Sequence, residues 1–540
     1  MKKYFPYFYF FVNSCILYLL YYPAREGRFV HDFIGWAWLY NHFTWIDILK
    51  CKVDHSYHLF YQVFFYSFYK LFHTHATRWL LLFSVLCSGV TTLIFVLFKK
   101  ILKQANSPHA FGIALMGSLL AMLSPFMDET FAWGATIHYF ISAGAMMLAW
   151  LLIIKYVESN RLKFLIGATG LYFIAMFSLE IAFVFPFIIA VYLFFCPKTY
   201  KVSIRQSIYI LLPQFFIIAL YFILNIIIKG TAVGHYGAAV HLNLSPPFLA
   251  SQFACYLAKY LAFEHFRDFP ERDKVYTFLQ RNEIGYLLFT ILYILPIIIF
   301  FIRFKRMHPV WRVGFVLYFI TCFALLPTQN LYFMYLFRTE NDRMGYFFSL
   351  FLFMGVSYLF IRYLKWVGYL ILIVYGIIGI HYLKGEIGDW KQTGDVVRTL
   401  TNEYTWQNNK GKVHILCLGD NMNGVYLFKN YKDTTFFSEY YEVMKSKHPS
   451  NLQQYMYWTM FSENDQTNAY KINDSTIQVD LLSGGWLMNN GLGAIDYETT
   501  DASIKVNQQK SSYKITFKHK QPDDVYIYES GLHWKQVNDF

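Results

Sequence analysis

Long apolar runs dominate the first 383 residues and constrain the fold more than any other feature of this sequence. Each run is close to twenty residues, and a helix of about that length spans the ~30 Å hydrocarbon core of a membrane. Hydrophobic residues make up 56% of the 540-residue chain and charged residues 15%, unlike the composition of soluble proteins. The sequence therefore predicts a mainly α, polytopic transmembrane helix bundle of about eleven spans. The expected spans are residues 4–22, 79–98, 110–127, 138–154, 164–179, 181–196, 207–228, 284–302, 313–327, 344–361 and 366–383.

The loops between these runs differ in charge. With the amino terminus inside, the inner loops are rich in Lys and Arg, and Glu158 is their single acid. Basic residues concentrate on the cytoplasmic side of membrane proteins, so we expect a cytoplasmic amino terminus and, with an odd number of spans, residues 384–540 outside. The net charge of +13 is thus a signal of topology and not of nucleic-acid binding. No small-residue cleavage site follows the first run, which predicts a retained helix.

Residues 384–540 differ in kind from the membrane part, residues 1–383. They are polar, carry charges of both signs and predict an extracytoplasmic α+β domain large enough to fold around its own core. Helical spacing covers residues 389–404. Alternating β-branched and aromatic residues predict strands at 412–418, 424–428, 476–482, 503–506, 513–517 and 525–528. Two outer loops, residues 23–78 and 229–283, belong to the membrane part, and we expect the second to lie on the membrane surface and cap a cavity.

Two carboxylates near the outer ends of spans are the candidate catalytic groups. Asp32 lies beyond the first span and before an aromatic segment, where it would act as a general base that takes a proton from an attacking hydroxyl. The alternative is a solvated loop acid or the cap of a helix over residues 33–40. Glu180 stands between long apolar stretches, where an unpaired carboxylate is costly. It therefore either acts in catalysis or pairs with a group that shapes the site.

Other charged residues at the outer ends of spans are candidates for binding a substrate phosphate, a substrate hydroxyl or a metal ion. Arg338 and Arg343 precede the tenth span, and a guanidinium can fork onto phosphate oxygens; the alternative is interface anchoring with local ion pairs. His138 either contacts a phosphate or is a hydrogen-bonded structural residue. Asp128 and Glu129 end the third span and are able to bind an acceptor or a divalent cation, Mg²⁺ or Mn²⁺. A solvated helix end is the more common role of such a pair.

Several motifs are absent from the sequence. It has no Walker phosphate loop, no dinucleotide-binding glycine fingerprint, no H-E-x-x-H and no G-x-S-x-G, so an enzyme that uses nucleotides is not expected. Transporters typically carry acids or broken helices at mid-membrane. The acids here lie instead at the outer rim, which favours a site between the bundle and the outer domain.

Short segments in the first 365 residues resemble one family. The chain is similar to the GT-C membrane glycosyltransferases, above all to the protein O-mannosyltransferase-like branch that includes the TMTC proteins and their bacterial relatives. The resemblance lies in the order and spacing of these segments along the chain. In chain order they are Asp32, residues 54–60 (DHSYHLF), 73–75 (HTH), 129–133 (ETFAW), 178–180 (SLE) and 340–346 (ENDRMGY).

The resemblance implies a sugar transferase that works on the outer face of a membrane, which we expect to be a bacterial inner membrane. The donor would be a polyprenyl-phosphate-linked sugar, the acceptor a glycan, lipid or protein hydroxyl, and the anomeric carbon would be inverted. Asp32 would be the base, with Arg343 and His138 near the donor phosphate. Asp54, in the first outer loop, is a further acceptor or metal candidate. Asp32 lacks the adjacent acid that many relatives have.

The sequence leaves three other functions open. A flippase or transporter of lipid-linked glycans would move its substrate without any bond formation that depends on Asp32. An envelope polysaccharide polymerase would depend on arginines in the outer loops, and a non-catalytic glycan-binding scaffold would tolerate the loss of Asp32.

Overall fold

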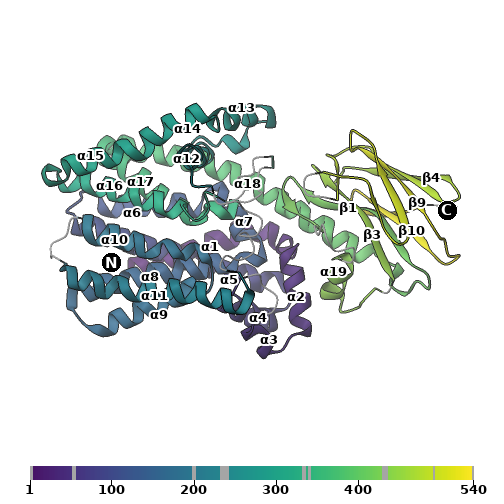
Figure 1. Ribbon diagram of the computed structural model, residues 1–540, viewed down its shortest axis with the longest axis horizontal. Coiled ribbons are helices and arrows are strands. Elements are labelled where there is room, and N and C mark those ends of the chain that lie inside the picture. Colours follow the sequence, from purple (N-terminus) through teal and green to yellow (C-terminus); the bar gives the residue numbers. More distant parts are fainter. Residues whose placement is uncertain are drawn as a thin grey trace.

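The computed structural model describes residues 4–51, 56–196, 202–231, 243–330, 336–337, 342–428, 436–449, 451–489 and 493–537. Helices gather at one end of the molecule and strands at the other (Figure 1). A single helix, α18 (Trp366–Glu403), runs from the helical part into the β-rich part. The predicted end of the membrane part, residue 383, therefore falls inside a continuous helix.

The helical part is built from the apolar runs. Its helices are α1 (Phe5–Tyr21), α5 (Ala76–Gln104), α6 (Ala110–Met122), α8 (Ile137–Ser159), α9 (Leu162–Met176), α10 (Phe185–Phe195), α11 (Ile204–Lys229), α14 (Asn282–Phe289), α15 (Leu295–Arg303), α16 (Pro309–Leu325) and α17 (Tyr346–Leu364). A π-helical stretch, η6 (Thr290–Ile294), joins α14 to α15. Helical structure thus covers most of each predicted span.

Length and composition select fewer of these helices as membrane spans. In the described part of the chain, six helical stretches are long and apolar enough to cross a membrane, or up to seven if a bent pair counts as one span. They begin at Ala76, Gly134, Ile204, Asn282, Asp342 and Trp366. The helices α9 and α16 and the stretch Glu180–Phe195 are apolar but shorter.

Acidic residues lie at two breaks in the helices. The bent pair consists of α6 and the segment formed by η2 (Pro125–Met127) and α7 (Asp128–Ala132), which meet at 64°. Pro125 lacks an N–H donor and restricts the residue before it, which explains the break. A second break, η4 (Glu180–Val184), is a tight turn between α9 and α10.

The first outer loop is helical and is clamped between the bundle and α18. Its elements are η1 (Tyr22–Arg28), α2 (Asp32–His42), α3 (Trp45–Leu49) and α4 (Leu59–Phe72). The helix α18 crosses η1 at two glycines: a Cβ on Gly394 would lie 2.6 Å from the backbone nitrogen of Gly27, and a Cβ on Gly27 would clash with the Trp390 carbonyl. Only a residue without a side chain permits this backbone contact.

The second outer segment is described from residue 243 onward. It folds into α12 (Pro246–Ala262), η5 (Glu264–Phe266) and α13 (Phe269–Leu279). The helix α12 packs against the bundle through Phe253, Tyr256 and Tyr260, which are buried. This packing also buries Lys259, the one cation among the buried residues of α12.

The C-terminal domain contains two sheets. The first has the strand order β11-β10-β1-β3-β6, with β2 paired to β1, and the second has the order β4-β5-β9-β8-β7. The strands are β1 (Val413–Met422), β2 (Val425–Tyr426), β3 (Leu452–Met460), β4 (Thr467–Asn473), β5 (Thr476–Leu481), β6 (Leu487–Met488), β7 (Tyr497–Glu498), β8 (Ala502–Val506), β9 (Ser512–Phe517), β10 (Val525–Ser530) and β11 (His533–Gln536). The strands β3 and β10 run parallel to β1.

The two sheets pack face to face. The Tyr513 hydroxyl of β9 donates to the Leu416 carbonyl of β1 at 2.5 Å, and the ring of His414 lies 5.2 Å from that of Phe517. The short helix α19 (Phe436–Lys445) connects β2 with β3 and packs against α2 of the first outer loop. All six predicted strands are confirmed. The strands β3, β4, β6, β7 and β11 were not predicted, and the residues of β3 are almost all buried.

Candidate functional site

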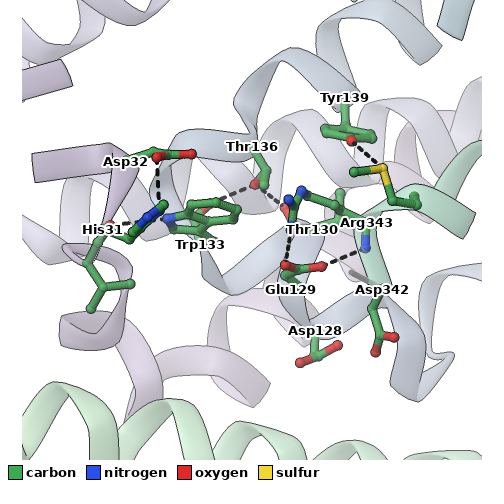
Figure 2. Close-up of polar contacts among 12 residues, drawn as sticks. His31, Asp32, Asp128, Glu129, Thr130, Trp133, Thr136, Tyr139, Asp342 and Arg343 are labelled. Atoms are coloured by element: carbon green, nitrogen blue, oxygen red, sulfur yellow. Dashed lines mark hydrogen bonds and ion pairs between the residues drawn. The ribbon is translucent and has the colours of Figure 1, made fainter. Parts of the chain in front are cut away.

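Asp32 is the first residue of α2 and keeps an accessible carboxylate. Half of its side chain is exposed, and its Oδ1 lies 2.8 Å from Nδ1 of His31 (Figure 2). His31 adopts a φ of 45°, which is uncommon for a residue with a side chain. An acid in the first turn of a helix also interacts favourably with the helix dipole. The start of α2 and His31 thus hold the carboxylate without covering it.

Trp133 lies between Asp32 and a buried ion pair. Its indole N–H donates to the Val30 carbonyl at 3.2 Å, which fixes the ring against the first outer loop. On one side the His31 ring is 5.9 Å away, centroid to centroid. On the other side the Arg343 guanidinium lies 4.9 Å from the indole (Figure 2). A cation over an aromatic face is attracted by the ring's quadrupole.

Arg343 is paired with Glu129 in a nearly dry environment. The guanidinium forms an ion pair with Oε1 of Glu129, and the Arg343 backbone N–H donates to Oε2 at 2.8 Å. The two side chains are 11% and 3% exposed. Both carboxylate oxygens are therefore engaged by one residue of η8 (Asp342–Gly345), which ties α7 to the start of α17.

A second set of buried charges lies beside this pair. Asp128 is fully buried, and its Oδ2 accepts a hydrogen bond from the Trp390 indole of α18 at 2.9 Å. Asp342 is paired with Lys259, and both side chains are at most 3% exposed. Asp128 and Glu129 are therefore not a solvated helix end: they connect α7 to α18 and to η8.

The acids do not fit a divalent cation. Within the described ranges, no group of three or more His, Cys, Asp or Glu side chains is arranged to hold a metal ion. Glu129, Asp342 and Asp128 each already engage a cation or an indole N–H. The role of Asp128 and Glu129 as metal ligands is therefore not supported by their surroundings, and no chemical step is assigned to a metal.

Glu180 connects the bundle to the first outer loop. Its carboxylate accepts a hydrogen bond from Ser56 Oγ at 2.6 Å, and Nε2 of His58 lies 3.3 Å away. The side chain is 31% exposed. Of the two roles considered for Glu180, these contacts correspond to a pairing that shapes the site.

His138 begins α8 and has partners of its own. Its Nδ1 lies 3.0 Å from the Ala135 carbonyl, and its ring centroid is 4.4 Å from that of Tyr61 in α4. These contacts match the structural role considered for it. The remaining candidates, Asp54 and Arg338, lie outside the described residues.

Three residues of this region were not among the sequence candidates. His31 is adjacent to Asp32, and Lys259 is the lone cation on the buried face of α12, a pattern that could have been noticed. Arg28 is fully buried, donates to the Phe131 carbonyl at 2.7 Å and lies 4.8 Å from the Phe83 ring. Burial lowers the pKa of Arg28 to about 9. Nothing in the local sequence signals this burial.

No protein-family model matches this chain, and no curated protein matches it. The fold and the composition of its helices define only a broad class of protein. The protein is mainly helical, with several helices compatible with a multi-pass membrane protein and a C-terminal β domain. Accessible and buried charged groups meet where the first outer loop, the bundle and α18 join.

Proposed function

We propose that the protein is a membrane glycosyltransferase of the GT-C type. It transfers a sugar from a polyprenyl-phosphate-linked donor to an acceptor hydroxyl, with inversion at the anomeric carbon. The observation that carries the proposal is the arrangement around Trp133, which has the accessible Asp32 with His31 on one side and Arg343 on the other. Inverting displacement requires a base beside the acceptor and a cation beside the leaving group.

In the proposed reaction, Asp32 accepts the proton of the acceptor hydroxyl as that oxygen attacks the anomeric carbon. A new glycosidic bond forms while the bond between the anomeric carbon and the phosphate oxygen breaks. The leaving polyprenyl phosphate gains negative charge, which Arg343 stabilises from the other side of Trp133. The half-exposed carboxylate of Asp32 supports its role as the base, because a base must reach its substrate.

Contacts among buried and partly buried side chains hold the proposed catalytic groups in fixed positions. Glu129 and Trp133 together orient the Arg343 guanidinium, and Glu180 holds the first outer loop through Ser56 and His58. Catalytic groups held by such contacts need little rearrangement when charge develops. Asp128 and Glu180 act as positioning residues in this proposal, and the acceptor is a glycan, lipid or protein hydroxyl.

The membrane arrangement is also part of the proposal. Eleven crossings place the amino terminus in the cytoplasm and the C-terminal domain outside a bacterial inner membrane. Support comes from helical structure in every predicted span and from the excess of Lys and Arg in the inner loops. The donor lipid then lies among the helices while its sugar reaches Asp32 at the outer rim.

Donor cleavage by the purified full chain in lipid nanodiscs tests the proposal. A panel of radiolabelled polyprenyl-phosphate sugars is supplied, and both the freed polyprenyl phosphate and the destination of the sugar are followed. We expect cleavage of at least one donor, with the sugar transferred to an added hydroxyl acceptor or to water. Binding of the donors without cleavage of any of them would contradict the proposal.

A further inference from the structure

One residue of the C-terminal domain contacts the surroundings of Asp32 directly. The Tyr426 ring, on β2, stacks on His31 with centroids 4.7 Å apart and an interplanar angle of 30°. It also lies 5.5 Å from the Trp133 ring. Tyr426 is only 8% exposed, so its ring serves contacts within the protein and offers no open platform for a sugar.

His31 needs such contacts to stay where it is. A φ of 45° costs free energy for a residue with a side chain, on the order of 1–3 kcal/mol, and persists only when the surroundings hold it. The Asp32 carboxylate contacts Nδ1 of His31, and the rings of Tyr426 and Trp133 lie near the imidazole ring. The position of His31 next to Asp32 is therefore determined partly by the C-terminal domain.

The strand that carries Tyr426 is itself fixed. Tyr426 is paired with Asn421 of β1, and the Gly424 backbone N–H donates to the Asn421 side chain at 3.2 Å. In the turn between the strands, the Asn423 amide donates to Asp389 of α18 at 3.1 Å. Tyr426 thus reaches His31 from a strand, and the turn that precedes this strand is bound to α18, the helix that connects the two parts of the molecule.

We propose that Tyr426 is a positioning residue for the reaction: it holds His31, and through His31 the Asp32 carboxylate, in the geometry required for proton transfer. This inference rests on the proposed function. It means that the C-terminal domain completes the candidate site and is not a separate module. Displacement of catalytic groups by about 1 Å can cost roughly a hundredfold in rate, so the loss of one clamping ring is expected to be measurable.

The test uses the full chain in nanodiscs, with Tyr426→Ala, Tyr426→Leu and Tyr426→Phe compared with the wild type. Tyr470→Ala, which removes an exposed ring from β4 of the same domain, is the control. Two quantities are measured: kcat and KM for donor cleavage, and the rate at which diethyl pyrocarbonate modifies His31, read by peptide mass spectrometry. The second measurement does not depend on activity.

We expect Tyr426→Ala to lower kcat roughly tenfold to a hundredfold with little change in the KM for the donor, and to make His31 react several-fold faster. The Leu variant keeps apolar bulk and should show the same changes to a smaller extent, while Phe should restore both values. Tyr470→Ala should match the wild type.

Unchanged kcat and unchanged His31 reactivity in folded Tyr426→Ala and Tyr426→Leu variants would overturn the inference while leaving the proposed function intact. If the wild type cleaves no donor, the proposed function fails, and His31 reactivity alone decides whether Tyr426 holds His31. Equal reactivity in wild type and Tyr426→Ala would then overturn the inference as well.

Discussion

At the scale of single residues, the charges of the site fall into two groups. Asp32 is half exposed beside His31, and Glu180 is partly exposed beside His58. Glu129 and Arg343, in contrast, are almost completely buried as an ion pair. Separating such a pair leaves an uncompensated charge in a dry environment, which costs far more than the intact pair contributes. The ion pair with Glu129 therefore holds the Arg343 guanidinium in place, whereas the carboxylates of Asp32 and Glu180 are at least partly exposed to solvent.

Replacing one member of the buried pair should be worse than replacing both. We expect Glu129→Gln to lower the free energy of unfolding by about 3 kcal/mol, because it leaves the Arg343 guanidinium buried without a counter-charge. The double variant Glu129→Gln with Arg343→Gln should recover part of that loss. Thermal unfolding of the four proteins in nanodiscs forms a double-mutant cycle. If the losses of stability in the two single variants simply add up in the double variant, the ion pair does not contribute to stability as expected.

Glu529 allows a prediction about pH in the C-terminal domain. Its carboxyl group, on β10, is fully buried, and burial raises its pKa to about 8; a hydrogen bond from the Gly419 N–H opposes this only in part. Because the folded chain keeps a proton that the unfolded chain releases near pH 4.5, stability falls as the pH rises from about 4.5 to 8. The scale is roughly 1.4 kcal/mol for each pKa unit.

Glu529→Gln should remove this fall, because the amide is neutral at every pH and can still accept from Gly419. Hydrogen–deuterium exchange of β1 and β10, corrected for its intrinsic pH dependence, measures the local opening free energy. The variant should be more stable than the wild type at pH 8 and similar to it near pH 4. The control is Glu498→Gln, whose side chain is 71% exposed and should leave the profile unchanged. A wild-type profile that is flat between pH 5 and 8 would contradict the prediction.

At the scale of elements, α18 is the connection between the two parts of the molecule. Its 38 residues give a length of about 57 Å, which exceeds a membrane's hydrocarbon core and extends into the C-terminal domain. The sequence predicts a span over 366–383 and a separate helix over 389–404, since composition changes near residue 384. Helical hydrogen bonding does not depend on that change, so the helix continues. The same helix contacts η1 at the Gly27–Gly394 crossing.

Two alanine substitutions in α18 should have opposite effects. Gly394→Ala places a Cβ 2.6 Å from the Gly27 backbone, so the helix must move away from η1, at a cost of about 1–3 kcal/mol. Gly385→Ala meets nothing within 4 Å and should stabilise the helix by up to about 1 kcal/mol. Thermal unfolding in nanodiscs compares the two. Equal effects would mean that the crossing does not hold the first outer loop.

At the scale of the whole molecule, local sequence patterns predicted the elements better than the contacts between them. Apolar runs and alternating strands are local, so helices cover every predicted span and all six predicted strands form. Lys259 and Asp342 lie 83 residues apart, and Tyr426 lies far along the chain from His31, so no local pattern pairs them. In the candidate site, Asp32 could be predicted from the local sequence. Tyr426, which contacts its neighbour His31, comes from a distant element and could not be predicted.

The most direct test of the account is the effect of Asp32→Asn on donor cleavage by the full chain in nanodiscs. The matched control is Asp268→Asn, an exposed acid before α13 whose side chain makes no capping hydrogen bond. If Asp32 is the general base, Asp32→Asn should lower kcat by about 10²- to 10⁴-fold while donor binding and Asp268→Asn activity stay near wild type. Wild-type turnover by Asp32→Asn would contradict the central claim and remove Asp32 from the mechanism.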